Sequence, residues 1–284
     1  MKYAMIFTLT MTLLAANYAF AAPGDIIRHQ SITGDPADGI YGFAMDWSDG
    51  NIWVAGNGAG DYQAEFAKID PETLEPVTSW QPVDTDVRRA LDIGYGFSVG
   101  GNTYLTFADL ESPFLKAIDP ANGNYIHGFD DYFTPSEGTV GSTVDSALNR
   151  VYISSAGGGL INDEIVYFES GSPWQVFANT PTFGWNTGLA LGWDRLFVLH
   201  TAHPDILVYT LDGTLEETII MPGWDEWANG LACCRVNAVG DNESLIFRSL
   251  ESVGEQVYEV EVGDYADETS IKSASLGEIK ALFK

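Results

Sequence analysis

The chain has 284 residues, and 40 Asp and Glu against 13 Lys and Arg give it a formal net charge of −27 at pH 7. This charge repels phosphate backbones and anionic lipid surfaces, which excludes a nucleic-acid-binding protein from our expectations. The acidic residues are scattered along the chain. We interpret them as charge that keeps the protein soluble, with binding of a divalent cation such as calcium as the alternative.

Residues 1–21 are predicted to be a secretory signal peptide. Lys2 precedes a short apolar run from Ala4 to about Ala16, and Ala19-Phe20-Ala21 then supplies the small-x-small pattern of a cleavage site. An N-terminal membrane anchor is the alternative. No later segment has the roughly 20 apolar residues that span a bilayer. We therefore expect a secreted or periplasmic protein, without a membrane span after cleavage, in an oxidising compartment.

Residues 22–265 are predicted to form one all-β domain that is built from a repeat. Runs in which apolar and polar residues alternate, bounded by Gly, Asp, Asn and Pro, fill this region. The first strand of the repeat occurs at residues 43–46, 91–94, 142–145, 189–192 and 231–234. The second strand follows at residues 52–55, 104–107, 151–154, 196–199 and 245–248. Four short strands at intervals of roughly 45 to 52 residues are typical of a β-propeller blade.

We expect five four-stranded blades, closed by the N-terminal strand, with six blades as the alternative. The fifth repeat has no convincing fourth strand, whereas residues 25–32 are strand-like and precede the first blade. If residues 25–32 pair with the last blade, the ring closes and an exposed sheet edge is covered. Residues 266–284 are predicted to form a separate C-terminal tail, in which Ser275 and Glu278 match a capping box and predict a short helix, with a frayed end as the alternative.

Two segments of the chain carry a family resemblance. The segments "NTGLALGWDRLFVLHTAHPDILVYTLDGTLEE" (186–217) and "WANGLACC" (227–234) resemble NHL-repeat propellers and the gluconolactonase (senescence-marker) superfamily. The resemblance covers the fourth and fifth repeats well and the others loosely, and it implies a β-propeller. Lactonases of this superfamily hold a divalent metal at the pore through residues that include an Asn before Gly-Leu. Asn229 matches that Asn by motif. Asn186 lies one residue further from its Gly-Leu pair than the motif requires.

The default ligand pocket of a propeller lies around the central channel. The residues before the first strands and the loops between the second and third strands gather there on one face. The candidate ligand-binding residues on this face are Tyr41, Arg88, Arg89, Glu137, Asn186, His200 and Asn229. Arg88 and Arg89 would clamp an anion or a carboxylate, and neutralisation of neighbouring acids such as Asp84 is the alternative.

His200, His203 and Asp205 form a weaker candidate metal site, since His and Asp side chains are common metal ligands. The alternative is a chance spacing in a turn that Pro204 favours. The chain contains no G-x-S-x-G, H-E-x-x-H, phosphate-loop or C-x-x-C motif.

We therefore expect a monomeric binding or interaction scaffold that takes a small molecule, a glycan or a protein at the pore face. The alternatives are a metal-assisted, lactonase-like hydrolase or lyase, which the resemblance implies, and a carbohydrate-binding, lectin-like propeller.

The two cysteines of the chain, Cys233 and Cys234, are neighbours. The repeat places Cys233 at a core-facing apolar position and Cys234 where the first strand breaks into a turn. A turn permits a strained disulfide between adjacent residues, and an oxidising compartment favours it. We expect this vicinal disulfide, with two reduced thiols, one of them buried in the core, as the alternative.

Overall fold

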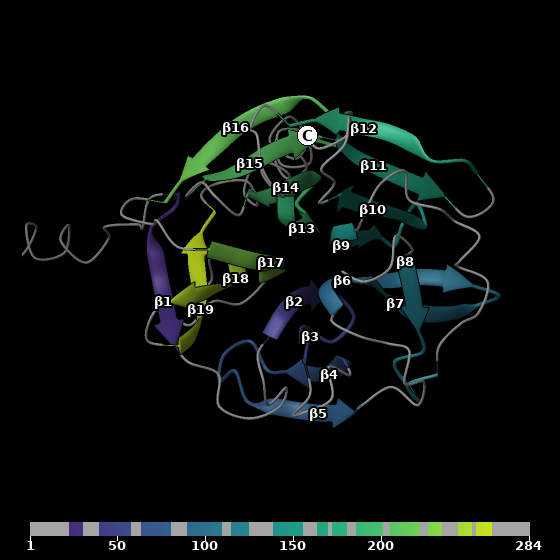
Figure 1. The fold of residues 1–284 in the computed structure, drawn as a ribbon, viewed down its shortest axis with the longest axis horizontal. Helices are drawn as coiled ribbons and strands as arrows, with labels where there is room; N and C mark the ends of the chain where they lie inside the picture. Colours follow the sequence, from purple (N-terminus) through teal and green to yellow (C-terminus); the bar gives the residue numbers. More distant parts are fainter. Residues whose placement is uncertain are drawn as a thin grey trace, which may run out of the picture.

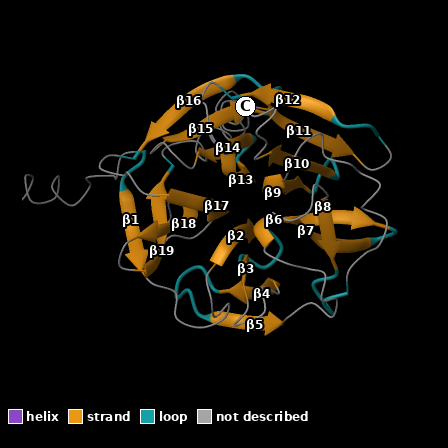
Figure 2. Cartoon of the chain, in the orientation of Figure 1, coloured by secondary structure: helices purple, strands orange, loops and turns teal. Residues whose placement is uncertain are grey.

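Five antiparallel sheets surround a central axis in the computed structural model of the chain (Figure 1). The structure describes residues 23–30, 40–57, 64–80, 90–109, 115–124, 139–155, 164–169, 172–180, 186–200, 205–221, 227–234, 244–251 and 254–262. Within these residues all regular secondary structure is β-strand (Figure 2). The prediction of an all-β, five-bladed propeller is confirmed. The predicted signal peptide and C-terminal tail lie outside the described residues.

Each of the first four blades is built from consecutive strands that start at the axis. The first blade contains β2 (Ile40–Met45), β3 (Ile52–Asn57), β4 (Ala64–Ile69) and β5 (Pro76–Trp80). The second contains β6 (Ala90–Val99), β7 (Asn102–Asp109) and β8 (Leu115–Ile118). The third contains β9 (Thr139–Asp145), β10 (Arg150–Ser155), β11 (Glu164–Glu169) and β12 (Gln175–Asn179). The fourth contains β13 (Asn186–Gly192), β14 (Arg195–His200), β15 (Asp205–Thr210) and β16 (Leu215–Ile220). The fourth strand predicted for the second blade, at residues 125–129, lies outside the described residues.

The fifth blade combines both ends of the propeller domain. It contains β17 (Trp227–Cys234), β18 (Ser244–Glu251), β19 (Gly254–Glu261) and, at its outer edge, β1 (Ile26–Gln30). β1 pairs antiparallel with β19, so that Ile26 lies opposite Val260 and Gln30 lies opposite Val257. The prediction that the N-terminal strand closes the ring is therefore confirmed.

Arg28 on β1 fixes the seam between the last blade and the first. Its Nη2 lies 2.9 Å from a carboxylate oxygen of Glu259, a residue only 1% exposed. The same guanidinium donates hydrogen bonds of 2.6 and 2.7 Å to the backbone oxygens of Pro71 and Glu72, in the turn between β4 and β5. One side chain thus joins β1, β19 and the first blade.

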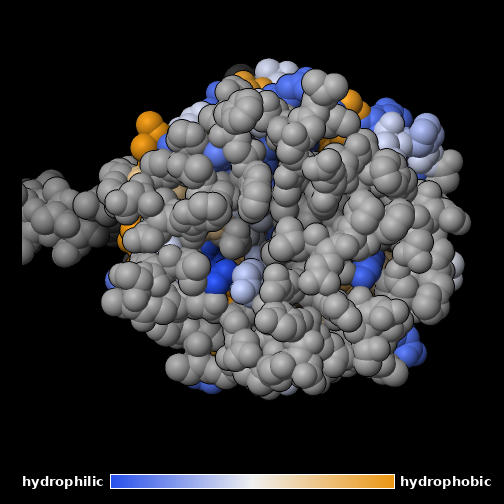
Figure 3. Space-filling view, viewed as in Figure 1, coloured by the Kyte–Doolittle hydropathy of each residue, from blue (hydrophilic) through white to orange (hydrophobic). Residues whose placement is uncertain are grey.

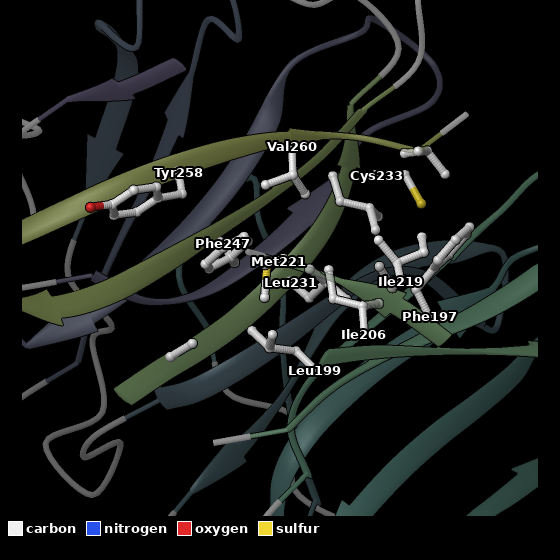
Figure 4. Close-up of a cluster of buried hydrophobic side chains, with 14 of the residues drawn as sticks. Phe197, Leu199, Ile206, Ile219, Met221, Leu231, Cys233, Phe247, Tyr258 and Val260 are labelled. Atoms are coloured by element: carbon white, nitrogen blue, oxygen red, sulfur yellow. The ribbon is translucent and has the colours of Figure 1, made fainter. Parts of the chain in front are cut away.

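The core of the propeller lies between blades, because a four-stranded sheet cannot bury both of its faces alone. Figure 4 shows the cluster between the fourth and fifth blades, where Phe197 and Ile206 pack against Leu231 and Phe247. Similar clusters of buried side chains join every other pair of neighbouring blades. Each blade therefore depends on its two neighbours for burial of its apolar faces.

The structure places the two cysteines at the end of β17. Cys233 is 1% exposed and lies in the cluster of Figure 4, as the repeat predicts. β17 ends at Cys234, which still pairs with Ser244, and the residues that follow lie outside the described part of the chain. Successive side chains of a strand point to opposite faces. The described part of the chain contains no disulfide, so the vicinal bridge is not confirmed.

Replacement of Arg28 by Ala should lower the free energy of unfolding by about 3 kcal/mol, because it leaves the buried Glu259 carboxylate without its ion pair. Urea unfolding measures this loss. The control is Arg195→Ala, whose pair with the more exposed Glu216 should contribute less than about 1 kcal/mol. Equal losses in the two variants would contradict a special role of Arg28 at the seam.

Candidate functional site

The innermost strands β2, β6, β9, β13 and β17 approach one another closely at the axis. A Cβ atom placed on Gly42 would lie 2.6 Å from the Cα atom of Asp92 in the neighbouring blade. Gly230 has a φ of +61° and lies against the backbone oxygen of Tyr41. Glycine tolerates both the positive φ and the contact with a neighbouring backbone. At this level the centre of the ring is filled by protein.

Asp92 occupies this crowded centre. It is the first paired residue after a register shift in β6. The equivalent residues, directly after the same shift in β2 and β13, are Gly42 and Gly188. The Asp92 side chain is completely buried. One carboxylate oxygen accepts a hydrogen bond from the backbone N–H of Phe43 at 3.4 Å, and the other accepts from those of Ser142 and Leu189, both at 3.0 Å. A single carboxyl group thus links the second blade to the first, third and fourth.

The position of Asp92 changes its protonation. Burial raises the pKa of the Asp92 carboxyl well above its ordinary value, and the backbone N–H groups of Leu189, Ser142, Ile93 and Phe43 lower that pKa only in part. The folded protein therefore holds the proton of this carboxyl to a higher pH than the unfolded chain does.

Polar residues stand at one end of the inner strands, on one side of Asp92. Asn186 lies opposite His200 in the fourth blade, and Asn229 lies opposite Arg248 in the fifth. Both pairs directly precede a register shift, so they stand at the same level of neighbouring blades. We call this group, together with Tyr41 of the first blade and Thr180, the polar mouth.

Hydrogen bonds between blades hold buried side chains at and beside the polar mouth. The side chain of Asn186 is completely buried, and its Nδ2 donates to the hydroxyl of Thr180 at 3.1 Å. The Thr187 hydroxyl donates to the backbone oxygen of Ala228 at 2.7 Å, and the Ser154 hydroxyl donates to that of Asn186. The Oδ1 atom of Asn186 has no hydrogen-bond partner in the structure. It is an acceptor that a ligand could use.

Arg248 brings a cation to the polar mouth. Its side chain is 2% exposed, and its Cζ lies 4.4 Å from the centroid of the Tyr41 ring. This cation–π contact joins the fifth blade to the first. Figure 3 shows hydrophilic side chains near the middle of this face, close to where β2 and β17 meet. Sequence reasoning missed Arg248, although a charged residue that ends the apolar run "LIF" is the signal that marks it.

The structure brings together part of the predicted site. Tyr41, Asn186 and His200 lie at the polar mouth, as does the backbone of Asn229. Arg88, Arg89, Glu137 and His203 lie outside the described residues, and so does the side chain of Asn229. Asp205 begins β15, and the described residues contain no group of three or more His, Cys, Asp or Glu that could hold a metal. The metal site at His200, His203 and Asp205 stays a prediction.

The comparisons with known proteins extend only to the fold. No family model matches the chain, and no curated protein matches it. A chain of a nidogen/laminin complex is 12% identical over 83% of this chain and 81% of its own length, with a TM-score of 0.57. The glutaminyl cyclase of Myxococcus xanthus is 12% identical over 83% and 94%, with a TM-score of 0.55. A tail fibre of a Staphylococcus aureus phage is 12% identical over 93% and 59%, with a TM-score of 0.52. These similarities support a β-propeller.

A search of the described residues for a helix long and apolar enough to cross a membrane found none.

Replacement of Asp92 by Ala should lower the free energy of unfolding by about 3 to 5 kcal/mol, because three buried N–H groups lose their acceptor and a cavity forms at the axis. Thermal and urea unfolding measure the loss. Asp212→Ala is the control, since Asp212 also accepts a hydrogen bond from a backbone N–H, that of Thr214, but lies on an exposed turn. A melting temperature as little changed as that of the control would contradict the central role of Asp92.

The raised pKa of Asp92 predicts a pH dependence with a defined sign. As pH rises from the ordinary carboxyl range through the raised pKa, the folded state loses a proton that the unfolded chain has already lost. The stability that this carboxyl contributes should fall across that window. Urea unfolding of the natural protein and of Asp92→Asn at several pH values tests it. A stability difference that stays constant with pH would show an ordinary pKa for Asp92.

Proposed function

We propose that this chain is an exported β-propeller that binds a small, oxygen-rich molecule at the polar mouth. The observation that carries the proposal is the buried Asn186, whose Oδ1 has no hydrogen-bond partner in the structure. A buried acceptor in this state costs about 1 to 3 kcal/mol, which a hydroxyl or amino group of a ligand would recover.

The other residues of the polar mouth define the ligand further. Arg248 presents a planar set of N–H donors that stack on Tyr41, and such a group suits the oxygen atoms of a carboxylate or a hydroxyl-rich molecule. His200, opposite Asn186, adds an imidazole that donates or accepts. A ligand with both oxygen acceptors and O–H or N–H donors matches this set.

The fold does not decide between binding and catalysis. Solved propellers similar to this chain include a glutaminyl cyclase and a chain of a nidogen/laminin complex. One is named as an enzyme and the other as part of a complex, in agreement with the many functions that one fold can carry. We favour a binding protein, because the observation that carries the proposal, the unpaired Oδ1 of Asn186, accounts for the binding of a ligand but not for a chemical step. A metal-assisted hydrolase or lyase and a lectin-like propeller are the alternatives.

If the ligand binds at the polar mouth, Asn186→Leu should weaken its affinity roughly tenfold or more, since the loss of one buried hydrogen bond has about that effect. Calorimetric titration with monosaccharides, hydroxy acids and calcium chloride identifies the ligand class. Asn102→Leu on the exposed start of β7 is the matched control, and Arg248→Lys removes the planar donor set while it keeps the charge. Melting curves establish that each variant is folded.

Binding that survives both Asn186→Leu and Arg248→Lys would contradict a site at the polar mouth. Turnover of a lactone that requires calcium would instead support the enzyme, and binding of sugars without turnover would support the lectin-like alternative.

Export predicts that the mature protein begins at residue 22 or 23. Expression in a bacterial host, followed by N-terminal sequencing of the periplasmic and extracellular fractions, measures this end. Protein that keeps residues 1–21 and stays with the cells would contradict the proposed export.

A further inference from the structure

Aromatic side chains gather at the end of the axis opposite the polar mouth. Trp47, in the turn between β2 and β3, is 40% exposed, and its ring centroid lies 6.3 Å from that of Trp193 in the turn between β13 and β14. These turns belong to the first and fourth blades, which are not neighbours in the ring. Trp47 therefore reaches across the end of the axis. We call Trp47, Trp193 and Tyr95 the aromatic mouth.

A hollow lies below the aromatic mouth. It is small, with room for about one water molecule, and side chains from all five inner strands line it. Trp47 and Tyr95 form part of its lining, and small side chains such as Ala44, Ala190 and Ala232 form another part. The hollow is thus bounded by two aromatic rings and by short side chains.

Trp193 has a backbone conformation at the aromatic mouth that is unfavourable for a tryptophan. Trp193 and Asp194 have φ values of 50° and 57°, in the left-handed region. Tight hairpin turns of this kind favour Asn or Gly at such positions, and a bulky residue is unfavourable there. The Trp193 ring packs edge-on against Phe197, with centroids 5.7 Å apart. Strained residues of this kind occur often at ligand clamps.

Negative charge surrounds the aromatic mouth. Asp46, Asp49, Asp145 and Asp194 lie in or beside the turns at this end. Burial raises the pKa of the Tyr95 phenol, and the nearby Asp46 carboxylate adds to this shift. The described cations near these turns are bound already: Lys68 to Asp46 and Asp49 at 2.7 and 2.5 Å, Arg150 to Glu169, and Arg195 to Glu216.

We propose that the aromatic mouth is a second binding site and that it takes a small organic cation, namely a substituted ammonium group. Ring faces of Trp and Tyr attract such cations, and carboxylates around them strengthen the attraction. An anion would be repelled by the carboxylates, and an uncharged molecule of the same shape would gain only the contact with the rings. The site lies beyond Asp92 from the polar mouth and does not depend on the function proposed there.

Choline is the probe, and 3,3-dimethylbutan-1-ol, its uncharged analogue of the same shape, is the matched control ligand. Calorimetry and saturation-transfer NMR on the mature protein, at constant ionic strength, measure both affinities. Choline should bind at millimolar concentration, and the alcohol should bind roughly tenfold more weakly or not at all. Trp47→Ala and Trp193→Asn should each weaken the affinity for choline by a similar factor. Asn is chosen at residue 193 because it tolerates the left-handed backbone conformation there.

Val77→Ala, on the exposed face of β5, and Asn186→Leu, at the polar mouth, should leave choline binding unchanged. The latter separates this site from the function proposed above. Three results would overturn the proposal: no binding of choline, equal binding of the uncharged alcohol, or choline binding that survives loss of both tryptophans. Binding of glucose in place of choline would identify a sugar platform and would overturn it as well.

Discussion

The hydrogen bonds that Asp92 accepts from three other blades are the constraint on which the centre of this propeller depends. The innermost strand of every blade has an edge without a neighbour in its own sheet, and backbone N–H groups on that edge face the axis. Buried N–H groups need acceptors. Glycines let the inner strands come close, and one carboxylate then serves several of them at once.

Because Asp92 fills the axis, the two ends of the channel are separate chemical environments. One end has neutral hydrogen-bonding groups and the Arg248 guanidinium on Tyr41. The other has tryptophan rings among carboxylates. A molecule bound at one end cannot touch the other, so we expect the two proposed sites to select ligands of different charge. They are connected only through the inner strands that both of them share.

The sequence predicts those features that depend on period and position along the chain. The repeat predicts five blades, and the unpaired N-terminal run predicts β1 as the closing strand. Asn186 and His200 were identifiable because they flank strands of the repeat. Asp92 and Arg248 were not, because register shifts near the axis decide which residue faces it. The repeat aligns Asp92 with Ala44 and Ala190, whereas the structure places it level with Gly42.

The closure by β1 has a consequence for cooperativity. An open array of repeats has terminal units from which it frays, and each unit adds its own increment of stability. A ring joined at Arg28 and Glu259 has no terminal blade, so every blade has two neighbours. Among the described strands, β1, which completes the ring, is translated first, and its partner β19 is translated last. The circle therefore cannot close until nearly the entire propeller has been synthesised, and its blades gain their mutual support together.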